Sequence, residues 1–354
     1  MKVRTRGLLV ALVVLPWLIL PAAGYWLLSH LERPLEVEED TVLEVNPGAS
    51  LSGLVHRMAR QGWLGAEHEA QRRRLAVRLH ALTSDLDRRL QVGEYRVNRG
   101  DSLATVLERL ERGEVIQHAF TLVEGWHFRQ LRAFMRRHPA LRQTLDDASE
   151  EEIMEKLGRP GRHPEGWFAP DTYFFTRGES DLDILRRALA RQEAILERAW
   201  QQRAPDLPLD SAYEALILAS IVERETGVAG ERRKIAGVFV NRLNRNMRLQ
   251  TDPTVIYGMG EDYDGRIRTR DLRRHTPWNT YVIRGLPPTP IAMPGSAAIE
   301  ATVDPESTDA LFFVARGDGT HHFSETLQEH EDAVQRYQIN RRQDYRSTPP
   351  PEAK

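Results

Sequence analysis

The chain has 354 residues, of which 41% are hydrophobic and 28% are charged, and this composition is typical of a folded protein long enough for two modest domains. The net charge of −2 argues against a dedicated nucleic-acid-binding protein. Cysteine is absent, which excludes disulfide bonds and zinc–thiolate sites.

Residues 7–28 contain no charged side chain, and as a helix rising about 1.5 Å per residue they would span the roughly 30 Å core of a bilayer. A signal peptide cleaved near PAAG, residues 21–24, is the alternative. Because the apolar run continues past that point and Trp26 suits an interface, residues 1–30 are predicted to be a cytoplasmic tip and a retained transmembrane helix. Basic residues precede the span and a mainly acidic stretch follows it, so the rest of the chain is predicted to lie outside the cytoplasm.

After an acidic linker at residues 31–40, residues 41–118 are predicted to form a small α+β subdomain. The segment TVLEVNPGASLSGLVHRM indicates a strand, a Pro-Gly turn and a helix capped by Ser50 or Ser52. A helical stretch at about residues 66–90 follows.

The strand–turn–helix pattern then recurs in GEYRVNRGDSLATVLERLERGE, residues 93–114. Tyr95 and Val97 share one face of the strand, and Leu103, Val106 and Leu107 begin the apolar stripe of the helix. The arrangement resembles a LysM-like glycan-binding module, although a generic α+β packing module explains the pattern equally well.

Residues 119–345 are predicted to form a larger α+β domain, with an amphipathic helix from about residue 181 to 203. Aromatic residues beside glycine and acidic residues mark its first part, and they are either a surface on which sugar rings stack or part of the core. These residues are Trp126, Trp167, Phe168 and Tyr173.

Residues 219–258 carry one glutamate on the apolar face of a helix. The 100° periodicity places Glu225 on a stripe with Leu218 and Val222, and it places Glu223 on the opposite side. Burial raises the pKa of a carboxyl group, as a general acid at neutral pH requires. The helix is expected to end at Gly227 and the next to begin near Glu231, with a cleft between them.

Two other interpretations of this segment remain open. Glu214 lies on nearly the same stripe near the start of the helix, so spacing does not separate it from Glu225. A buried salt bridge is the structural alternative, because several arginines are close in sequence. They are Arg224, Arg232, Arg233 and Arg242.

Beyond Gly258 the sequence predicts short strands punctuated by proline and glycine, in TYVIRGLPPTPIAMPG and ALFFVARGDGTHHFS. His321, His322 and His330 suggest a metal site, but adjacent histidines on a strand point to opposite faces. A histidine that holds a loop over the cleft by a hydrogen bond is the preferred interpretation. Residues 346–354 are expected to be a disordered tail.

The chain resembles the YceG-like endolytic murein transglycosylases, the MltG family, in several motifs that stand in the family's order. They are EGWFAPDTY, the ERET segment with the residues that follow it, LQTDPTVIYGMG, NTY at residues 279–281, GLPPTPIAMPG, and HHF followed by His330. His322 stands where a small polar residue is more usual. The fold expected is therefore α+β: a single transmembrane helix, a LysM-like subdomain, and a YceG-like catalytic domain with its active-site glutamate at the end of a helix.

The resemblance assigns the catalytic role to Glu225. In the family this glutamate protonates the glycosidic oxygen between N-acetylmuramic acid and N-acetylglucosamine, and it then acts as base while the muramyl 6-hydroxyl attacks C1. No cofactor and no metal are implied. By resemblance the substrate-binding residues are Thr226, Gln250, Asp252, Tyr257, Asn279 and Tyr281.

Two alternative functions remain. Asp252 could complete a hydrolase pair with Glu225, because ordinary glycosidases use two carboxyl groups. A non-catalytic glycan-binding scaffold is the other alternative. The resemblance further implies a catalytic domain in the periplasm, anchored in the bacterial inner membrane, that acts on nascent peptidoglycan in association with penicillin-binding proteins or other cell-wall synthases.

Overall fold

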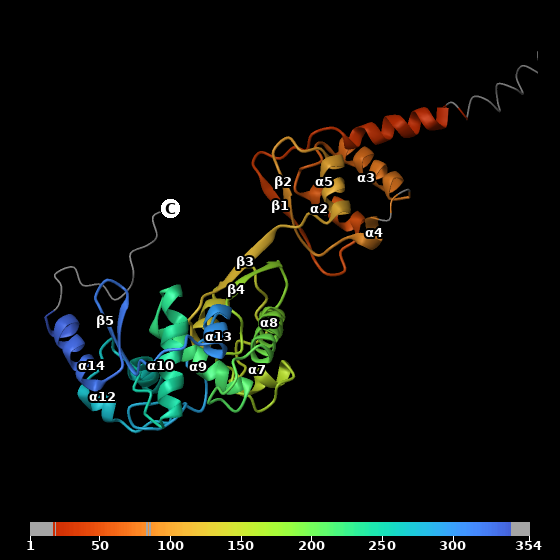
Figure 1. Cartoon of the computed structure of the whole chain (residues 1–354). Coiled ribbons are helices and arrows are strands. Elements are labelled where there is room, and N and C mark those ends of the chain that lie inside the picture. The colour runs from red at the N-terminus through yellow and green to blue at the C-terminus, as the bar shows by residue number, and fades with distance from the viewer. Residues whose placement is uncertain (1–16, 18, 83, 85, 341–354) are drawn as a thin grey trace, which may run out of the picture. The chain divides into compact units, whose positions relative to one another are not determined.

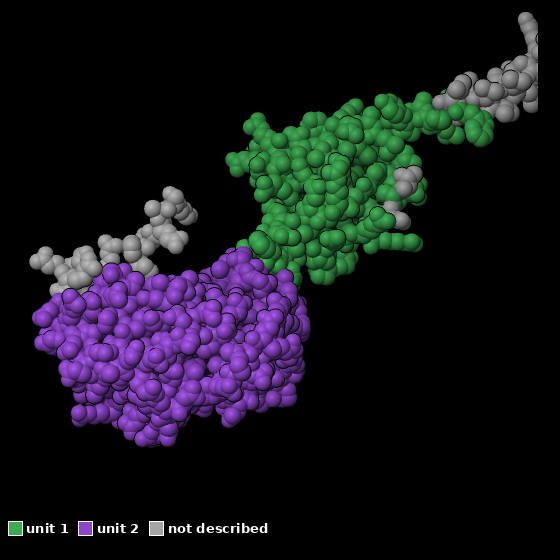
Figure 2. All heavy atoms as spheres, viewed as in Figure 1, with its two compact units in different colours: residues 1–119, 174–179 green, residues 120–173, 180–354 purple. Residues whose placement is uncertain are grey.

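The computed structural model describes residues 17, 19–82, 84 and 86–340. The chain divides into two compact units: unit 1 contains Met1–Ala119 and Phe174–Glu179, and unit 2 contains Phe120–Tyr173 and Ser180–Lys354 (Figure 2). Within the described ranges no helix is long and apolar enough to cross a membrane. Half of the predicted span, residues 7–16 and 18, and the predicted tail lie outside these ranges.

Unit 1 contains both predicted strand–turn–helix patterns. The strands β1 and β2 pair antiparallel, with Leu43 opposite Tyr95 (Figure 1). Its elements are a helix over residues 19–28 that continues into η1 (Ser29–Leu31), then β1 (Thr41–Val45), α2 (Leu51–Arg60), α3 (Glu67–Ala81), α4 (Leu86–Arg89), β2 (Gly93–Val97) and α5 (Leu103–Arg112).

Serine caps begin the two amphipathic helices of unit 1. The hydroxyl of Ser50 accepts a hydrogen bond from the Gly53 backbone N–H at 3.2 Å, so Ser50 rather than Ser52 is the cap of α2. Ser102 caps α5 in the same way, through the Thr105 N–H at 3.1 Å. Each cap satisfies an N–H group that has no partner within its own helix.

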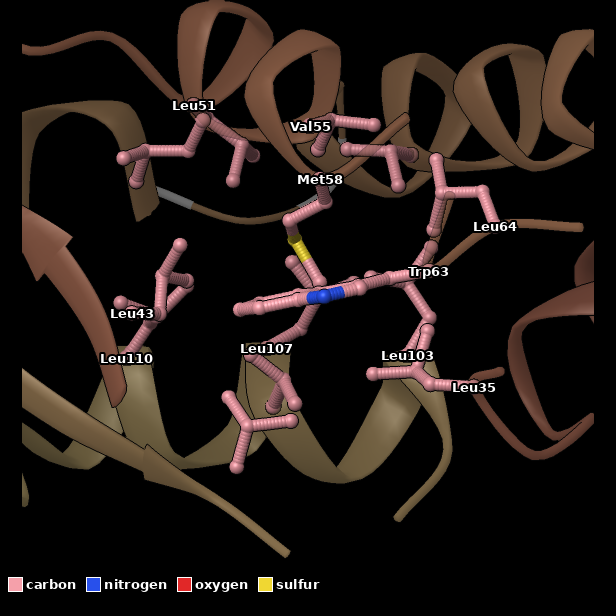
Figure 3. Packing of buried hydrophobic residues seen from close by; sticks show 14 of the residues in the cluster. Leu35, Leu43, Leu51, Val55, Met58, Trp63, Leu64, Leu103, Leu107 and Leu110 are labelled. Carbon is pink, nitrogen blue, oxygen red and sulfur yellow. The ribbon is translucent and has the colours of Figure 1, made fainter. Parts of the chain in front are cut away.

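The core of unit 1 surrounds Trp63, which follows α2. Figure 3 shows its indole among Met58, Leu103 and Leu107, which come from α2 and α5. Tyr95 is fully buried in the same core, and its hydroxyl donates to the Gln91 carbonyl at 3.1 Å. Burial of these side chains is the main source of stability for this unit.

The division between the units falls inside both strands of a second two-stranded sheet, formed by β3 (Gln117–Leu122) and β4 (Asp171–Thr176). Residues 174–179 group with unit 1, where Arg177 Nε contacts the Glu94 carboxylate at 2.5 Å. His118 contacts the other oxygen of Glu94 at 2.6 Å. Hydrogen bonds from these two side chains hold the pKa of Glu94 below its ordinary value, although burial acts in the opposite direction.

Unit 2 is built around α9 (Ala212–Glu225). It packs against α8 (Asp181–Gln201), α10 (Arg232–Asn244) and α13 (Ser296–Val303), which are labelled in Figure 1, and against α11 (Asp252–Met259). The remaining elements are α6 (Phe128–Arg136), α7 (Glu150–Lys156), η2 (Ala229–Glu231), η3 (Gly260–Asp262), α12 (Thr269–Arg273), the antiparallel strands β5 (Phe312–Ala315) and β6 (His321–Ser324), α14 (Leu327–Val334) and η4 (Gln335–Ile339). This mixture of helices and strands confirms the predicted α+β class, and the helix predicted near residues 181–203 is α8.

The prediction of a single apolar stripe on α9 is wrong. Every residue from 215 to 222 is buried, because neighbouring helices cover this segment on all sides. Glu223, predicted on the side opposite the core-facing stripe, has only 6% of its side chain accessible. It lies 3.7 Å from Arg232 and accepts a hydrogen bond from the Gly295 N–H at 3.0 Å.

One further prediction is wrong, and the choice between the two interpretations of the aromatic residues is decided. The run TYVIRGLPPTPIAMPG, residues 280–295, forms no strand, because proline lacks the N–H that a strand pair needs and fixes φ. Of the two interpretations of the aromatic residues, core packing is confirmed for Trp167, Phe168 and Tyr173, which are buried. Trp126 is half-buried against Phe134, at 5.2 Å between ring centroids.

Candidate active site

Glu225 is the last residue of α9, two residues before the predicted helix end. Thr226 follows in an extended conformation (φ −144°, ψ 136°), so the chain leaves the helix direction at this point. The Glu225 carboxyl group is partly buried and accepts a hydrogen bond from the Thr251 hydroxyl. Burial raises the pKa of Glu225 to about 7; the Thr251 hydrogen bond opposes this shift, and the charge of Asp252 adds to it.

No arginine neutralises Glu225 among the residues that the structure describes. Arg232 lies 3.7 Å from Glu223, and Arg233 pairs with Asp304 at 2.8 Å. Arg224 donates to the Gly125 carbonyl at 3.2 Å. The salt-bridge interpretation of Glu225 therefore fails, and its carboxyl group is free to exchange a proton.

Arg242 of α10 supports the segment that carries Thr251. Its guanidinium group is buried and donates to the Leu249 carbonyl at 2.7 Å and to the Leu311 carbonyl at 2.6 Å. It also lies 5.1 Å from the centroid of the Phe312 ring. The main chain beside Thr251 is thereby tied to Leu311, the residue before β5. The positive charge of Arg242 lowers the pKa of Glu225, against the effect of burial.

Three buried threonines, Thr251, Thr254 and Thr280, form a hydrogen-bonded threonine cluster beneath Glu225. The Thr254 hydroxyl donates to the Thr251 carbonyl at 2.7 Å and lies 2.8 Å from the Thr280 hydroxyl. The Thr280 hydroxyl accepts from the Thr251 N–H at 3.1 Å. Thr251 is thus held at its backbone while its own hydroxyl reaches Glu225.

Gln250 precedes the threonine cluster in a strained conformation. Its φ of +52° is unusual for a residue with a side chain, and its N–H donates to the Thr280 carbonyl at 3.2 Å. Its side chain is exposed. A predicted substrate-binding residue therefore stands directly beside the Thr251–Glu225 contact.

Asp252 and Tyr281 are joined by a hydrogen bond from the tyrosine hydroxyl at 2.7 Å. Asp252 is exposed at the start of α11, where the helix dipole favours a negative charge. The pKa of Tyr281 is raised, first by burial and then by its bond to Asp252. Asp252 thus has a partner that orients it beside Glu225.

Asn279 is 1% exposed, and its amide group is engaged with the main chain. Its Nδ2 lies 2.7 Å from the Arg274 carbonyl and 3.2 Å from the carbonyls of Asp271 and Leu272. Its Oδ1 accepts from the Tyr281 N–H at 3.0 Å. Asn279 therefore positions Tyr281 in this structure.

The other predicted site residues lie at the edges of this group. Thr226 is buried, and its hydroxyl accepts from the Val228 N–H at 2.9 Å. The hydroxyl of Tyr257 donates to Glu165 at 3.2 Å rather than to a residue of the Glu225 group. Glu214, the rival of Glu225, accepts from the Asp210 N–H at 2.6 Å at the opposite end of α9, so it is a capping residue.

The loop after Glu225 is fastened by a histidine. The backbone N–H of His321 donates to one oxygen of Glu231 at 2.9 Å, and its Nδ1 lies 2.8 Å from the other. This contact agrees with the preferred interpretation of the histidines. His322 lies beside Tyr337 and His330 stacks on Phe312, and no cluster of metal-binding side chains occurs in the described ranges.

The sequence interpretation missed Thr251, Thr280, Arg242 and Glu231 as parts of the site. Their contacts join segments far apart in the chain, and helical periodicity carries no information about such contacts. Thr251 does stand inside the LQTDPT motif, which was the available signal.

Comparison with known proteins identifies the family of this chain. The YceG-like family model matches residues 43–336. An "Endolytic murein transglycosylase" of Bacillus subtilis is 30% identical over 329 residues, which cover 87% of this chain and 88% of that protein. A protein with the same description from Streptococcus pneumoniae is 30% identical over 176 residues, covering 48% of this chain and 31% of its own length.

A solved structure shows the same fold. The crystal structure of a YceG-like protein from Listeria monocytogenes superposes with a TM-score of 0.52 at 26% sequence identity, covering 84% of this chain and 99% of that one. With a family match over most of its length, this chain belongs to the YceG-like family.

Proposed function

We propose that this protein is an endolytic lytic transglycosylase that cleaves the β-1,4 bond between N-acetylmuramic acid and N-acetylglucosamine within peptidoglycan strands. The description of its relatives supports the reaction class. One observation carries the assignment of Glu225: a carboxyl group whose pKa is raised to about 7 and which the structure pairs with a hydroxyl rather than with a cation.

Glu225 serves first as acid and then as base. Its proton passes to the glycosidic oxygen while the C1–O bond breaks, and the N-acetylglucosamine side leaves as an alcohol. The 6-hydroxyl of the muramyl residue then forms a new bond to C1 and gives its proton to the Glu225 carboxylate. No water is consumed, the carboxyl group regains its proton, and the product is a 1,6-anhydromuramyl end.

An internal nucleophile explains why one carboxyl group is sufficient. Hydrolases need a second carboxylate, about 5 Å away in retaining enzymes and roughly 6.5–9.5 Å in inverting ones. The 6-hydroxyl belongs to the reacting sugar, so it needs positioning rather than a second base. The role proposed for Asp252 is to hold Tyr281, and with it the sugar, beside Glu225.

The mass of the product ends distinguishes this function from a muramidase. We expect wild-type protein and Asp252→Asn to release fragments with anhydro ends from defined glycan strands, with Asp252→Asn slower. Reducing ends, which are heavier by one water, would overturn the lyase assignment. Loss of all cleavage in Asp252→Asn together with reducing ends in the wild type would favour the paired-carboxylate hydrolase.

We also propose that residues 7–28 anchor the protein in the inner membrane, with residues 41–118 as a LysM-like glycan-binding module and the catalytic unit in the periplasm. The charge-free run and the exposed Trp17, Leu20 and Trp26 support the anchor. Association with penicillin-binding proteins or other cell-wall synthases belongs to this proposal. Extraction from membranes by detergent but not by alkaline carbonate tests the anchor, since carbonate release would contradict it.

A further inference from the structure

A pocket of about 550 Å³ lies in unit 2, one residue along α9 from Glu225. Its wall includes Arg224, the neighbour of Glu225, and Tyr257 of α11. Asp252 and Tyr257 stand five positions apart on α11, which is about 7–8 Å along the helix axis. The pocket is therefore lined by residues of the same two helices that carry Glu225 and Asp252.

Glu165 forms the floor of this pocket and is 3% exposed. One carboxyl oxygen accepts from the Phe128 N–H at 3.0 Å, and the other accepts from the Tyr257 hydroxyl at 3.2 Å. Burial raises the pKa of Glu165 to about 8, so the group is mostly uncharged at neutral pH. A neutral carboxyl group and a phenol carry two protons, and the contact between them uses one. The other proton is shared between the Thr289 hydroxyl, which also hydrogen-bonds Tyr257, and a bound ligand.

Two histidines line the pocket, and their rings offer one hydrogen-bond acceptor and one hydrogen-bond donor. Nδ1 of His127 lies 2.7 Å from the Ile291 carbonyl, which only accepts, so Nδ1 carries the proton and Nε2 keeps a free lone pair. Nδ1 of His163 accepts from the Glu165 N–H at 3.2 Å, so its Nε2 carries a proton. Burial lowers the pKa of both rings, which keeps them neutral at neutral pH.

Aromatic rings complete the wall. Tyr257 lies 5.5 Å from Trp278 and 5.4 Å from His127, measured between ring centroids. The indole N–H of Trp278 donates to the Thr289 hydroxyl at 2.9 Å, which fixes its orientation. Such faces pack against the C–H groups of a sugar ring.

From these contacts we infer that the pocket binds an N-acetylated pyranose ring of the glycan, with the Glu165–Tyr257 pair and His163 donating to the acetamido carbonyl and His127 accepting from its N–H. This inference rests on the proposed function. Neutral donors and one neutral acceptor complement an amide, and aromatic walls complement the ring and the methyl group.

Chitotetraose is a suitable probe because it is uncharged and N-acetylated. Binding is measured by calorimetry with the full-length chain carrying Glu225→Gln, so that no cleavage occurs. Trp278→Ala on this background is expected to weaken binding by about tenfold or more. Trp200→Ala is the matched control, because Trp200 is also half-buried but lies on α8, outside the pocket.

Glu165 supplies a second, pH-dependent test that does not depend on Trp278. Binding is expected to be constant near pH 7 and to weaken above about pH 8, as Glu165 ionises and loses its proton. The same weakening is expected to be absent from Glu165→Gln, which keeps a donor but does not titrate. The other titratable groups that line the pocket are His127, Arg129, Glu150, His163, Arg224, Tyr257 and Tyr263.

Each result of these binding measurements either supports or overturns the inference. Equal affinity in Trp278→Ala and its parent, no binding of chitotetraose by Glu225→Gln at millimolar concentration, or an alkaline loss that persists in Glu165→Gln would overturn the inference. If Trp278→Ala does not fold, the Glu165 comparison decides. Cleavage of glycan strands by the wild type, measured separately, shows whether a failure belongs to the pocket or to the proposed function.

Discussion

The hydroxyl of Thr251 donates a hydrogen bond to the carboxyl group of Glu225, across 26 positions of sequence. A hydroxyl can donate to the ionised carboxylate and can rotate to accept from the protonated acid. It therefore supports both protonation states, which an arginine would not do. An acid that must give and then recover a proton needs a partner of this kind.

The pH dependence of cleavage should follow Glu225. Because the first step needs the protonated carboxyl group, kcat/KM is expected to fall as pH rises through about 7, the pKa of Glu225. The measurement is the initial rate of release of anhydro ends between pH 5 and 9. A rate that rises steadily to pH 9 would contradict an acid role for this group.

Thr251→Val should change both the rate and the pH profile. Loss of the hydroxyl removes a hydrogen bond that lowers the pKa of Glu225, so the alkaline limb is expected to move to higher pH. The maximal rate should fall by about twofold to tenfold, since such a bond contributes about 0.5–1.5 kcal/mol. Thr302→Val removes a buried hydroxyl in α13 that donates to the Ala298 carbonyl, and it should leave the profile unmoved.

The stability of the protein should fall as pH rises through the range in which Glu165 ionises. Its pKa is about 8 in the folded state against an ordinary value of 4.5, so the folded state holds a proton that the unfolded state has lost. The free energy of unfolding then declines between about pH 4.5 and 8. Urea unfolding at several pH values should show a shallower decline in Glu165→Gln; identical slopes would mean that Glu165 does not keep its proton.

His321→Ala should loosen the loop between Glu225 and α10. The variant loses the Nδ1 contact to Glu231, so hydrogen exchange of residues 226–231 is expected to accelerate. Cleavage should slow by roughly fivefold to tenfold, because misplacement of a positioned acid is costly. His322→Ala is the control, since this neighbour contacts Tyr337 rather than the loop. If hydrogen exchange of residues 226–231 is unchanged in His321→Ala, His321 does not position this loop.

Much of the architecture was predictable because it depends on local signals. Ser50 and Ser102 mark helix starts through their own hydroxyl groups, and the strand–turn–helix repeats have clear alternation. Periodicity also placed Glu225 on the buried face of its helix, but only the family resemblance separated it from Glu214. Helical periodicity gave the wrong prediction of which faces of α9 are buried. A helix covered on all sides has no single apolar stripe, and Glu223 is buried as well.

The partners of Glu225 were not predictable from local patterns. Thr251, Thr280 and Arg242 act through contacts between segments that are separated in sequence. Glu165 lies in the EGWF segment, whose aromatic residues were interpreted either as a sugar-stacking surface or as part of the core. Trp167 and Phe168 proved to be core, and the polar residue beside them lines the pocket. Amphipathic patterns report burial, but they do not report which buried polar group faces a cavity.

Digestion of defined glycan strands by Glu225→Gln, with the anhydro ends counted by mass spectrometry, tests the central claim most directly. Glu214→Gln, at the other end of the same helix, is the matched control. We expect Glu225→Gln to lose about 10²- to 10⁴-fold in rate while its thermal unfolding stays cooperative, and Glu214→Gln to cleave at close to the wild-type rate. Release of anhydro ends by folded Glu225→Gln at the wild-type rate would contradict the assignment of Glu225 as the catalytic acid.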